Sequence, residues 1–418
     1  MAFKPNDLND IKNTISIFKY GSTLRCPKAL KYRMHDFLVI INGGDNPAIE
    51  WHHESFRKWP EHYTILSKLS TNKIARLQRL IYSCPIFYNS LINSENKLIK
   101  YGVVSYDQFE KNLIHWPSSF LPGRFHKVIC PLNNIPLQLL NIINLNRMQA
   151  LKLSILSLLK YDYSISSEGI KSLFSDNSLK YLDKNYFLDE IPNDTYEIPL
   201  KNILEKIISI SYYGDIRCLT NHAYKKAVTK ELEGSLPYLF SVYFPLIVEL
   251  SKISSGNLNL NSPNLSNIDK LRDLARNIAS ALENEVIKDG LGGMNTKIKE
   301  SKEWFEFHRI YNNTNPSIMC NNNPVWIKKT FESLPDNIIS LCCKKAAARR
   351  LRMLSPLKLL SKNYIQTSRL NATLPWEGDV IADCIYYWNL RSSIIGLLLG
   401  IPSNIGKLMS YFVYKMSK

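Results

Sequence analysis

The stretch from Phe18 to Ile41 decides the fold expected for this chain: FKYGSTLR occupies positions 18–25 and HDFLVII positions 35–41. The second piece is an apolar run headed by Asp36, which is typical of a buried β-strand. Because glycine has no Cβ, Gly21 allows a turn that brings backbone N–H groups and the Ser22 hydroxyl against a triphosphate. Asp36, at the edge of the neighbouring strand, could hold the Mg²⁺ that bridges such phosphates. Taken alone, the pattern fits an ordinary turn better than a nucleotide site, so the nucleotide site is a hypothesis at this point.

Residues 1–135 mix short apolar runs with Pro and Gly, and the sequence predicts one clear helix over residues 72–80. The apolar runs are FLVIING (37–43), IKYGVVSY (99–106) and RFHKVICPL (124–132). Short apolar runs between turn residues are typical of strands, so we predict a candidate catalytic domain of mixed helices and strands, in the α+β class.

The rest of the chain divides into three stretches by composition. Residues 136–250 are helix-rich, with the pattern MQALKLSILSLL (148–159) before GIKSLF (169–174), and fit a small helical or winged-helix domain. Residues 251–343 hold Asn- and Ser-rich pieces around a predicted helix over 269–285, and suggest a partly flexible insertion. Residues 344–418 form a basic and apolar C-terminal region.

Charge favours an anionic partner. The 418 residues carry a formal net charge of +17, which suits nucleic acid, a lipid surface or a phosphorylated substrate. The C-terminal region interleaves apolar residues with basic ones and no acid between Lys344 and Lys362, and this composition favours an anionic membrane surface. We expect no membrane span: the nearest apolar segment, Ser392–Tyr414, contains Pro402 and Lys407.

Cysteine spacing and the N-terminus add little. The eight cysteines show no CxxC pair, which favours a reduced compartment without structural zinc. The N-terminal residues have neither the apolar core of a secretory signal nor the Arg-rich composition of a mitochondrial transit peptide.

A long ordered series of short motifs resembles the mitochondrial translocator-maintenance type of phosphatidate cytidylyltransferase. The similarity covers about residues 18–250 and, more loosely, the chain after Ser392. The motifs that carry it are Tyr20-Gly21-Ser22, Met34-His35-Asp36-Phe37, Trp51-His52, His62-Tyr63-Thr64, the KYGVVS block at 100–105, Trp116, the GRFHK block at 123–127 and the SYYGDIR block at 211–217.

The resemblance implies a polymerase-beta-like nucleotidyltransferase domain, a winged-helix domain and a C-terminal region on the matrix face of the inner mitochondrial membrane, as a peripheral protein. It implies synthesis of CDP-diacylglycerol and pyrophosphate from CTP and phosphatidic acid, on the route to cardiolipin and phosphatidylglycerol. No nucleic acid is expected as a partner.

The same resemblance assigns roles to individual residues. Gly21 and Ser22 would cradle the CTP phosphates, and Asp36 would bind Mg²⁺. Ordinary nucleotidyltransferases pair two acids on one strand, but Leu38 occupies the second position here, so Asp215 is our candidate for the second carboxylate; it equally fits a helix-capping turn. The cations expected to neutralise triphosphate or lipid phosphate are Lys100, Arg124 and Lys127.

Two histidine-containing motifs have simpler explanations than catalysis. We interpret His126 as a packed or surface histidine, since the substrate is already ionised near neutral pH. Trp51, His52, His62 and Tyr63 lack a third ligand at zinc spacing, so packing or pocket-lining roles are favoured, as for Tyr88.

Departures from the family pattern affect the expected nucleotide contacts. Thr23 stands where the family prefers glycine, and Ser55 replaces the Asn expected after Trp-His. Two other classes therefore stay open: a nucleotidyltransferase acting on RNA, which would need a basic groove beside the site, and a non-catalytic membrane-associated scaffold with the same fold.

Overall fold

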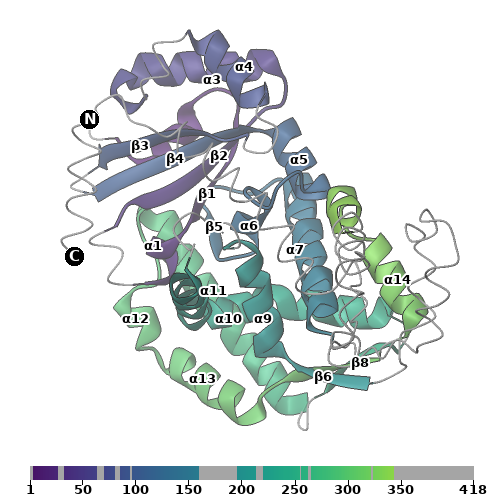
Figure 1. The fold of residues 1–418 in the computed structure, drawn as a ribbon. Coiled ribbons are helices and arrows are strands. Elements are labelled where there is room, and N and C mark those ends of the chain that lie inside the picture. The colour runs from purple at the N-terminus through teal and green to yellow at the C-terminus, as the bar shows by residue number, and fades with distance from the viewer. Residues whose placement is uncertain are drawn as a thin grey trace, which may run out of the picture.

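The computed structural model describes residues 3–26, 33–63, 70–80, 85–94, 97–159, 195–212, 220–254, 256–261, 265–321 and 323–342 (Figure 1). Asp215, the segment 169–174 and the basic C-terminal region lie outside these residues. The predictions made for them are therefore carried by the sequence alone.

A five-stranded mixed sheet forms the N-terminal part of the molecule. Its strands are β1 (Thr14–Tyr20), β2 (His35–Ile41), β3 (Phe87–Ser94), β4 (Lys97–Ser105) and β5 (Ile129–Pro131), in the order β3-β4-β2-β1-β5. The pair β2/β4 is parallel and the other pairs are antiparallel. β2 and β4 contain most of the first two apolar runs and β5 contains three residues of the third, so the prediction of mixed helices and strands, in the α+β class, is confirmed.

Helices cover both faces of this sheet (Figure 1). The N-terminal helices are η1 (Pro5–Asp10), α1 (Ser22–Arg25), α3 (Asp45–Lys58), η2 (Pro60–His62), α4 (Thr71–Leu80), α5 (Tyr106–His115), α6 (Pro122–Phe125) and α7 (Leu137–Leu158). On one face, Trp51 of α3 packs against Tyr101 of β4. On the other, Phe125 of α6 contacts both Phe18 of β1 and Phe109 of α5. Successive residues of a strand thus supply two separate cores, as period-two alternation requires.

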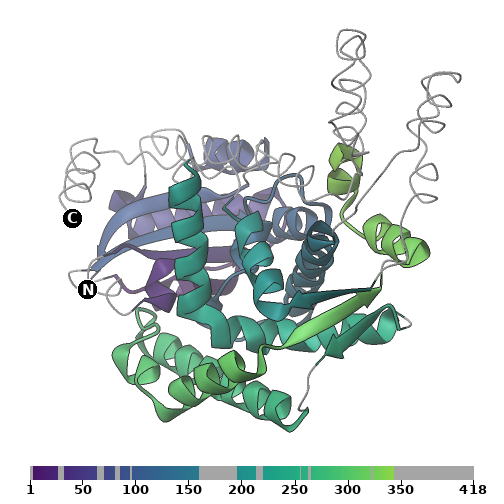
Figure 2. The same ribbon diagram turned by 60° about the horizontal axis from the view of Figure 1, so that its bottom comes forward.

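The C-terminal half is mainly helical and carries a small second sheet. Its elements are β6 (Thr195–Pro199), α9 (Leu200–Ile210), α10 (Asn221–Ile253), β7 (Leu258–Asn261), α11 (Leu265–Asp289), α12 (Thr296–Lys299), α13 (Lys302–Thr314), β8 (Ser317–Asn321) and α14 (Pro324–Glu332). The small sheet is antiparallel, in the order β6-β8-β7. Figures 1 and 2 place it at the end of the molecule away from the large sheet.

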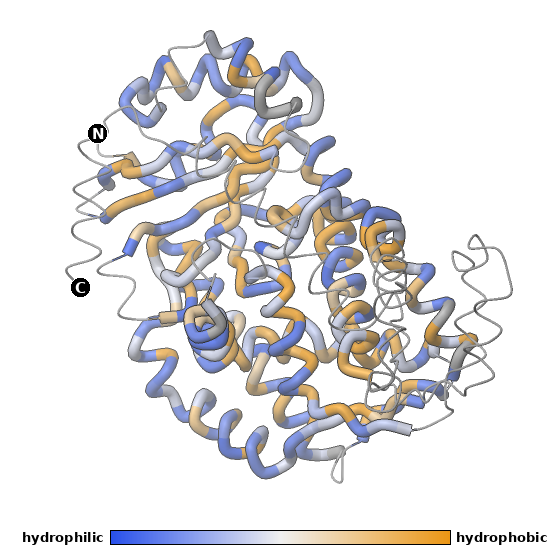
Figure 3. Tube along the Cα trace, in the orientation of Figure 1, coloured by the Kyte–Doolittle hydropathy of each residue, from blue (hydrophilic) through white to orange (hydrophobic). Residues whose placement is uncertain are grey.

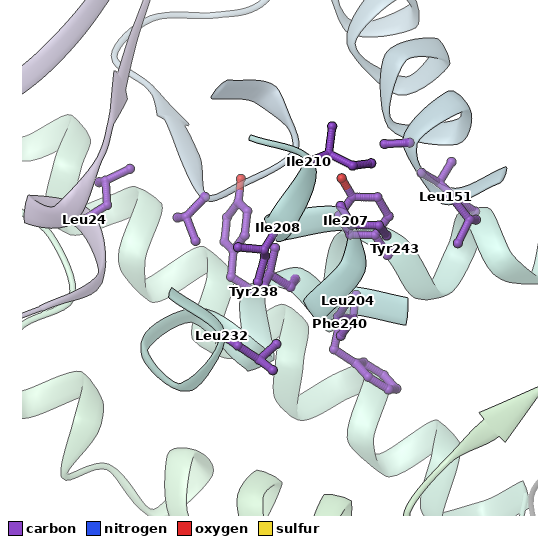
Figure 4. Packing of buried hydrophobic residues seen from close by; sticks show 14 of the residues in the cluster. Leu24, Leu151, Leu204, Ile207, Ile208, Ile210, Leu232, Tyr238, Phe240 and Tyr243 are labelled. Carbon is purple, nitrogen blue, oxygen red and sulfur yellow. The ribbon is translucent and has the colours of Figure 1, made fainter. Parts of the chain in front are cut away.

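Both halves share one hydrophobic core. Hydropathy along the chain is high in the central strands and in α7, and alternates in outer helices such as α3 and α13 (Figure 3). In Figure 4, Leu24 of α1 and Leu151 of α7 lie in one cluster with Leu204 of α9 and Leu232 of α10. Packing between α1 and α10 therefore crosses the boundary that the sequence places near residue 135.

The helix predicted over 269–285 is present as the longer α11. Leu271, Ala275, Ile278 and Leu282 are buried, with exposed fractions of 0, 0, 2 and 0%. A stretch suggested by composition to be a partly flexible insertion thus holds a core helix. The three boundaries between the four stretches, and the winged-helix identity of the second domain, remain predictions.

One helix in the described part of the chain, His222–Ile253 within α10, has the length and apolar composition of a membrane span. From the sequence we expected no membrane-spanning segment, and this helix was not singled out. Half of its most apolar window is buried, and Phe240 and Tyr243 are 0 and 1% exposed. Core helices of folded domains can have the same composition, and α10 packs against α9 and α11.

Candidate functional site

The strand register collects the predicted site residues on one sheet face. Asp36 of β2 lies opposite Tyr20 of β1 and, across the parallel pair, opposite Lys100 of β4. Opposed residues in neighbouring strands point to the same side. All three therefore project from the face that α5, α6 and α7 cover, next to its hydrophobic cluster.

Gly21 brings the turn after β1 directly against Asp36. Its φ is +87°, and a Cβ built at this position would lie 2.8 Å from Oδ2 of Asp36. Any other residue would be strained and would press on the carboxylate. Ser22 follows as the first residue of α1, whose Thr23 and Leu24 are buried. The predicted proximity of Gly21, Ser22 and Asp36 is thus present in the structure.

Two cations and two tyrosines complete this cluster. Lys100 Nζ lies 3.6 Å from Oδ1 of Asp36 and 4.4 Å from the ring centre of Tyr88. Arg124 of α6 donates through Nη2 to the Tyr88 hydroxyl at 2.7 Å, and its guanidinium carbon lies 5.6 Å from the ring centre of Tyr20. We call these five residues, Tyr20, Asp36, Tyr88, Lys100 and Arg124, the sheet-end cluster.

From the sequence we interpreted Tyr88 as a pocket-lining residue and assigned no separate role to Tyr20. The sequence feature that could have indicated the place of Tyr88 is Gly102, which pairs with Tyr88 across β3 and β4. A Cβ at Gly102 would lie 2.8 Å from the Tyr88 ring, so the glycine makes room for that side chain. A glycine inside a strand often marks such a close approach.

Lys127 belongs to a second group of residues. Its Nζ lies 4.3 Å from the ring centre of Tyr212, whose hydroxyl donates to Oε2 of Glu231 at 2.9 Å. The same carboxylate forms an ion pair with Arg25 of α1. Lys127 therefore contacts the network behind α1, whereas Lys100 and Arg124 contact the sheet-end cluster.

Within the sheet-end cluster, Asp36 supplies the one carboxylate that could hold a metal ion. No group of three or more possible His, Cys, Asp or Glu ligands occurs among the residues that the structure describes. Mg²⁺ commonly uses one or two carboxylates together with substrate phosphates and water. Asp36, 23% exposed beside the Gly21 turn, fits that arrangement. Leu38 is buried in the core beneath it, so position 38 supplies no ligand, and Asp215 remains the predicted second carboxylate.

His126 is a core residue, as the sequence interpretation favoured. Its side chain is fully buried, with Nε2 3.4 Å from Oδ1 of Asn146. Burial lowers the His126 pKa to about 3, against the opposing effect of the Asn146 hydrogen bond. The ring is thus neutral near pH 7 and packs against Trp116.

The Trp-His and His-Tyr motifs pack together on the opposite sheet face. Nδ1 of His52 lies 3.3 Å from the Tyr63 hydroxyl, and Nδ1 of His62 lies 3.2 Å from that of Tyr101. Trp51 donates to Thr14 at 2.8 Å. The packing role favoured from sequence is confirmed for these residues.

His62 should make the fold acid-sensitive. Burial lowers its pKa from 6.5 to about 4, so the unfolded chain binds a proton that the folded chain excludes between these pH values. Stability is therefore retained above pH 6.5 and falls as the pH drops toward 4, by about 3 kcal/mol from this residue. Urea unfolding across pH 4–7.5 measures it. His62→Gln should flatten the slope, and a slope equal to that of the unaltered protein would contradict the assignment.

Comparison with known proteins relates this geometry to a family. Residues 7–168 match the family model described as "Phosphatidate cytidylyltransferase, mitochondrial". That range contains Gly21, Ser22, Asp36, Lys100, Arg124 and Lys127.

Individual relatives with the same description are more distant. The protein of Caenorhabditis elegans is 24% identical over 222 residues, which is 53% of this chain and 56% of the relative. That of Danio rerio is 30% identical over 114 residues, or 27% and 33%, and that of Homo sapiens is 33% identical over 99 residues, or 24% and 21%. The chain thus spans about half or less of the length of these relatives. Its N-terminal part, residues 7–168, is thus similar to the mitochondrial phosphatidate cytidylyltransferase family.

Proposed function

We propose that this chain is a mitochondrial phosphatidate cytidylyltransferase, which makes CDP-diacylglycerol and pyrophosphate from CTP and phosphatidic acid. The observation that carries the proposal is the juxtaposition of the Gly21 turn, Asp36 and two cations within the family-matched residues. A carboxylate beside a glycine turn suits a metal-bound triphosphate, and the cations suit phosphate oxygens.

The reaction is an in-line displacement at phosphorus. A phosphatidate oxygen forms a bond to the α-phosphorus of CTP, the bond from that phosphorus to the bridging α–β oxygen breaks, and pyrophosphate departs with the electron pair. Such transfer depends on positioning and on charge stabilisation more than on covalent catalysis. A bound Mg²⁺ would neutralise charge on the leaving pyrophosphate.

Each side chain has a separate part in this scheme. Gly21 and Ser22 would contact phosphate oxygens through the turn backbone and the hydroxyl. Asp36 would hold the metal, with Asp215 as the second carboxylate. Lys100 supplies a compact charge and Arg124 a forked donor for the reacting phosphates. The ionised phosphate group of phosphatidic acid would supply the nucleophile, so the reaction needs no general base. The burial of His126 agrees with this.

The cellular site of action follows from the relatives, whose names place them in mitochondria. We propose peripheral attachment to the matrix face of the inner membrane through the basic and apolar residues 344–418. Phosphatidic acid would be taken from that surface, and the CDP-diacylglycerol would feed cardiolipin and phosphatidylglycerol synthesis.

The decisive experiment follows pyrophosphate release by the purified full chain. Liposomes with and without phosphatidic acid are supplied with CTP, ATP or GTP, in Mg²⁺ or in excess chelator. The proposal requires release that depends on CTP, phosphatidic acid and Mg²⁺ together. Turnover that ignores phosphatidic acid and extends an RNA primer would favour an RNA transferase, and absent turnover with retained liposome binding would favour a scaffold.

Tyr88→Phe should weaken CTP use while leaving the fold intact. The change removes the hydroxyl that receives the 2.7 Å hydrogen bond from Arg124. A hydrogen bond to a charged group is worth about 1.5 kcal/mol, so the KM for CTP should rise roughly tenfold with a smaller change in kcat. Tyr196→Phe on the small sheet is the matched control. Equal KM values for the two variants would remove Tyr88 from the site.

A further inference from the structure

Residues outside the family-matched range hold the segment that carries the proposed nucleotide turn. Helix α1 has four residues, follows Gly21 directly and ends at Arg25. Arg25 Nε lies 2.8 Å from Oε2 of Glu231 in α10, and the two side chains are only 12 and 5% exposed. The pair therefore links the end of α1 to a helix beyond residue 168.

Both side chains of this pair make further polar contacts. Oε2 of Glu231 also accepts from the Tyr212 hydroxyl at 2.9 Å, and Nη1 of Arg25 donates to the Lys230 carbonyl at 3.3 Å. Burial opposes the Arg25 charge, but the Glu231 carboxylate and Tyr212 outweigh it and raise the pKa of Arg25. A buried ion pair of this kind restrains geometry, because a displaced partner would leave the other charge unpaired.

Close backbone contacts hold α1 at further points. A Cβ at Gly234, one turn after Glu231, would lie 3.1 Å from the Arg25 carbonyl oxygen. The Met294 N–H donates to the Leu24 carbonyl at 2.7 Å. Leu24 itself is buried in the cluster that includes Leu232 (Figure 4). Helix α1 therefore packs closely against α10 and is bonded to the segment after α11.

We infer that Arg25, Glu231 and Tyr212 are positioning residues that set the nucleotide turn through α1. The inference rests on the proposed function, because the turn matters only if it receives a nucleotide. A displaced α1 would move the Gly21 turn relative to Asp36, whose Oδ2 would lie 2.8 Å from a Cβ added at Gly21. Small misplacements of this kind are costly in transfer reactions.

The expected signature is selective for the nucleotide. The Gly21 turn would contact CTP, whereas the proposed lipid-surface contacts lie in residues 344–418. Loss of the Arg25–Glu231 pair should therefore raise the KM for CTP and leave the KM for phosphatidic acid near its original value. A merely structural role would lower the amount of active enzyme, and with it the apparent kcat, without changing either KM.

Glu231→Gln is the direct test, since glutamine keeps the shape and an acceptor for Tyr212 but removes the charge. We expect the KM for CTP to rise roughly tenfold and the KM for phosphatidic acid to stay within about twofold. Glu233→Gln, at an exposed position of the same helix, is the matched control and should behave as the unaltered enzyme. An unchanged KM for CTP in folded Glu231→Gln overturns the inference while the proposed function stands.

Two further variants cover the case in which Glu231→Gln does not fold. Tyr212→Phe removes one hydrogen bond and retains the ion pair, and should raise the KM for CTP roughly threefold. The double variant Arg25→Gln with Glu231→Gln removes both charges, so thermal stability should recover while the KM for CTP stays high. Normal CTP kinetics in both variants overturns the inference. If the unaltered enzyme itself shows no CTP-dependent turnover, the proposed function fails and the inference falls with it.

Discussion

Asp36→Asn should reduce the CTP- and phosphatidate-dependent kcat by roughly 10³-fold, since the charge that stabilises a phosphoryl transition state is worth several kcal/mol. Asparagine preserves the shape of the side chain but removes the negative charge beside the Gly21 turn and Lys100. The uncompensated Lys100 should keep CTP binding measurable without Mg²⁺. The measurement is pyrophosphate release on phosphatidate liposomes, together with CTP binding by calorimetry.

The control is Asp269→Asn on the surface of α11, where the carboxylate is 64% exposed and pairs with Arg272 of the same helix. That variant should retain full activity. If Asp36→Asn remained as active as Asp269→Asn, Asp36 would not be a metal ligand and the proposed mechanism would be wrong.

Gly21→Ala should lower kcat/KM for CTP by roughly 10²-fold, because a misplacement of about 1 Å near the reacting groups has effects of that size. The new Cβ would meet Oδ2 of Asp36 at 2.8 Å, so the turn or the carboxylate has to move. Gly21 has φ +87° and ψ −168°, a conformation that essentially only glycine adopts, so alanine should lower the free energy of unfolding by about 1–3 kcal/mol. Steady-state kinetics and urea unfolding measure the two effects separately.

Gly256→Ala separates strain from the clash. Gly256 has a φ of +86°, almost that of Gly21, but nothing lies within 4 Å of its added Cβ. Both variants should therefore be destabilised by backbone strain, and only Gly21→Ala should lose activity. Equal kinetic losses in the two would assign the effect to global destabilisation and not to the turn.

Local pattern suggested the pairing of the Gly21 turn with Asp36, and the family resemblance was needed to favour it over an ordinary turn. The two residues lie in adjacent stretches of chain, and a glycine turn before an acid-headed strand is a local signal. Lys100 and Arg124 were placed through the family resemblance, because a parallel pairing of β2 with β4 requires a long crossover that no local periodicity reports. Their convergence on Tyr88 depends on tertiary packing.

Composition was a weaker guide than periodicity in the C-terminal half. Asn- and Ser-rich pieces suggested a partly flexible insertion over 251–343, yet Leu271, Ala275, Ile278 and Leu282 follow the spacing of one buried helix face. The role of Glu231 could not be predicted at all. An acidic residue within an apolar helix shows its partner only after the chain has folded, and Arg25 lies far from it in sequence.

Because α1 is attached to later elements, the range that matches the family model is smaller than the structural unit to which it belongs. A polypeptide ending at residue 168 would contain every family motif of the sheet-end cluster, yet Arg25 would lack its carboxylate and Leu24 would lack the cover of Leu232. Lys19, a buried residue of β1, would lose the Gly292 carbonyl to which it donates a hydrogen bond. The range 7–168 is thus not an independent structural unit. A chimera that contains this range would also need α10 and the 290–294 loop.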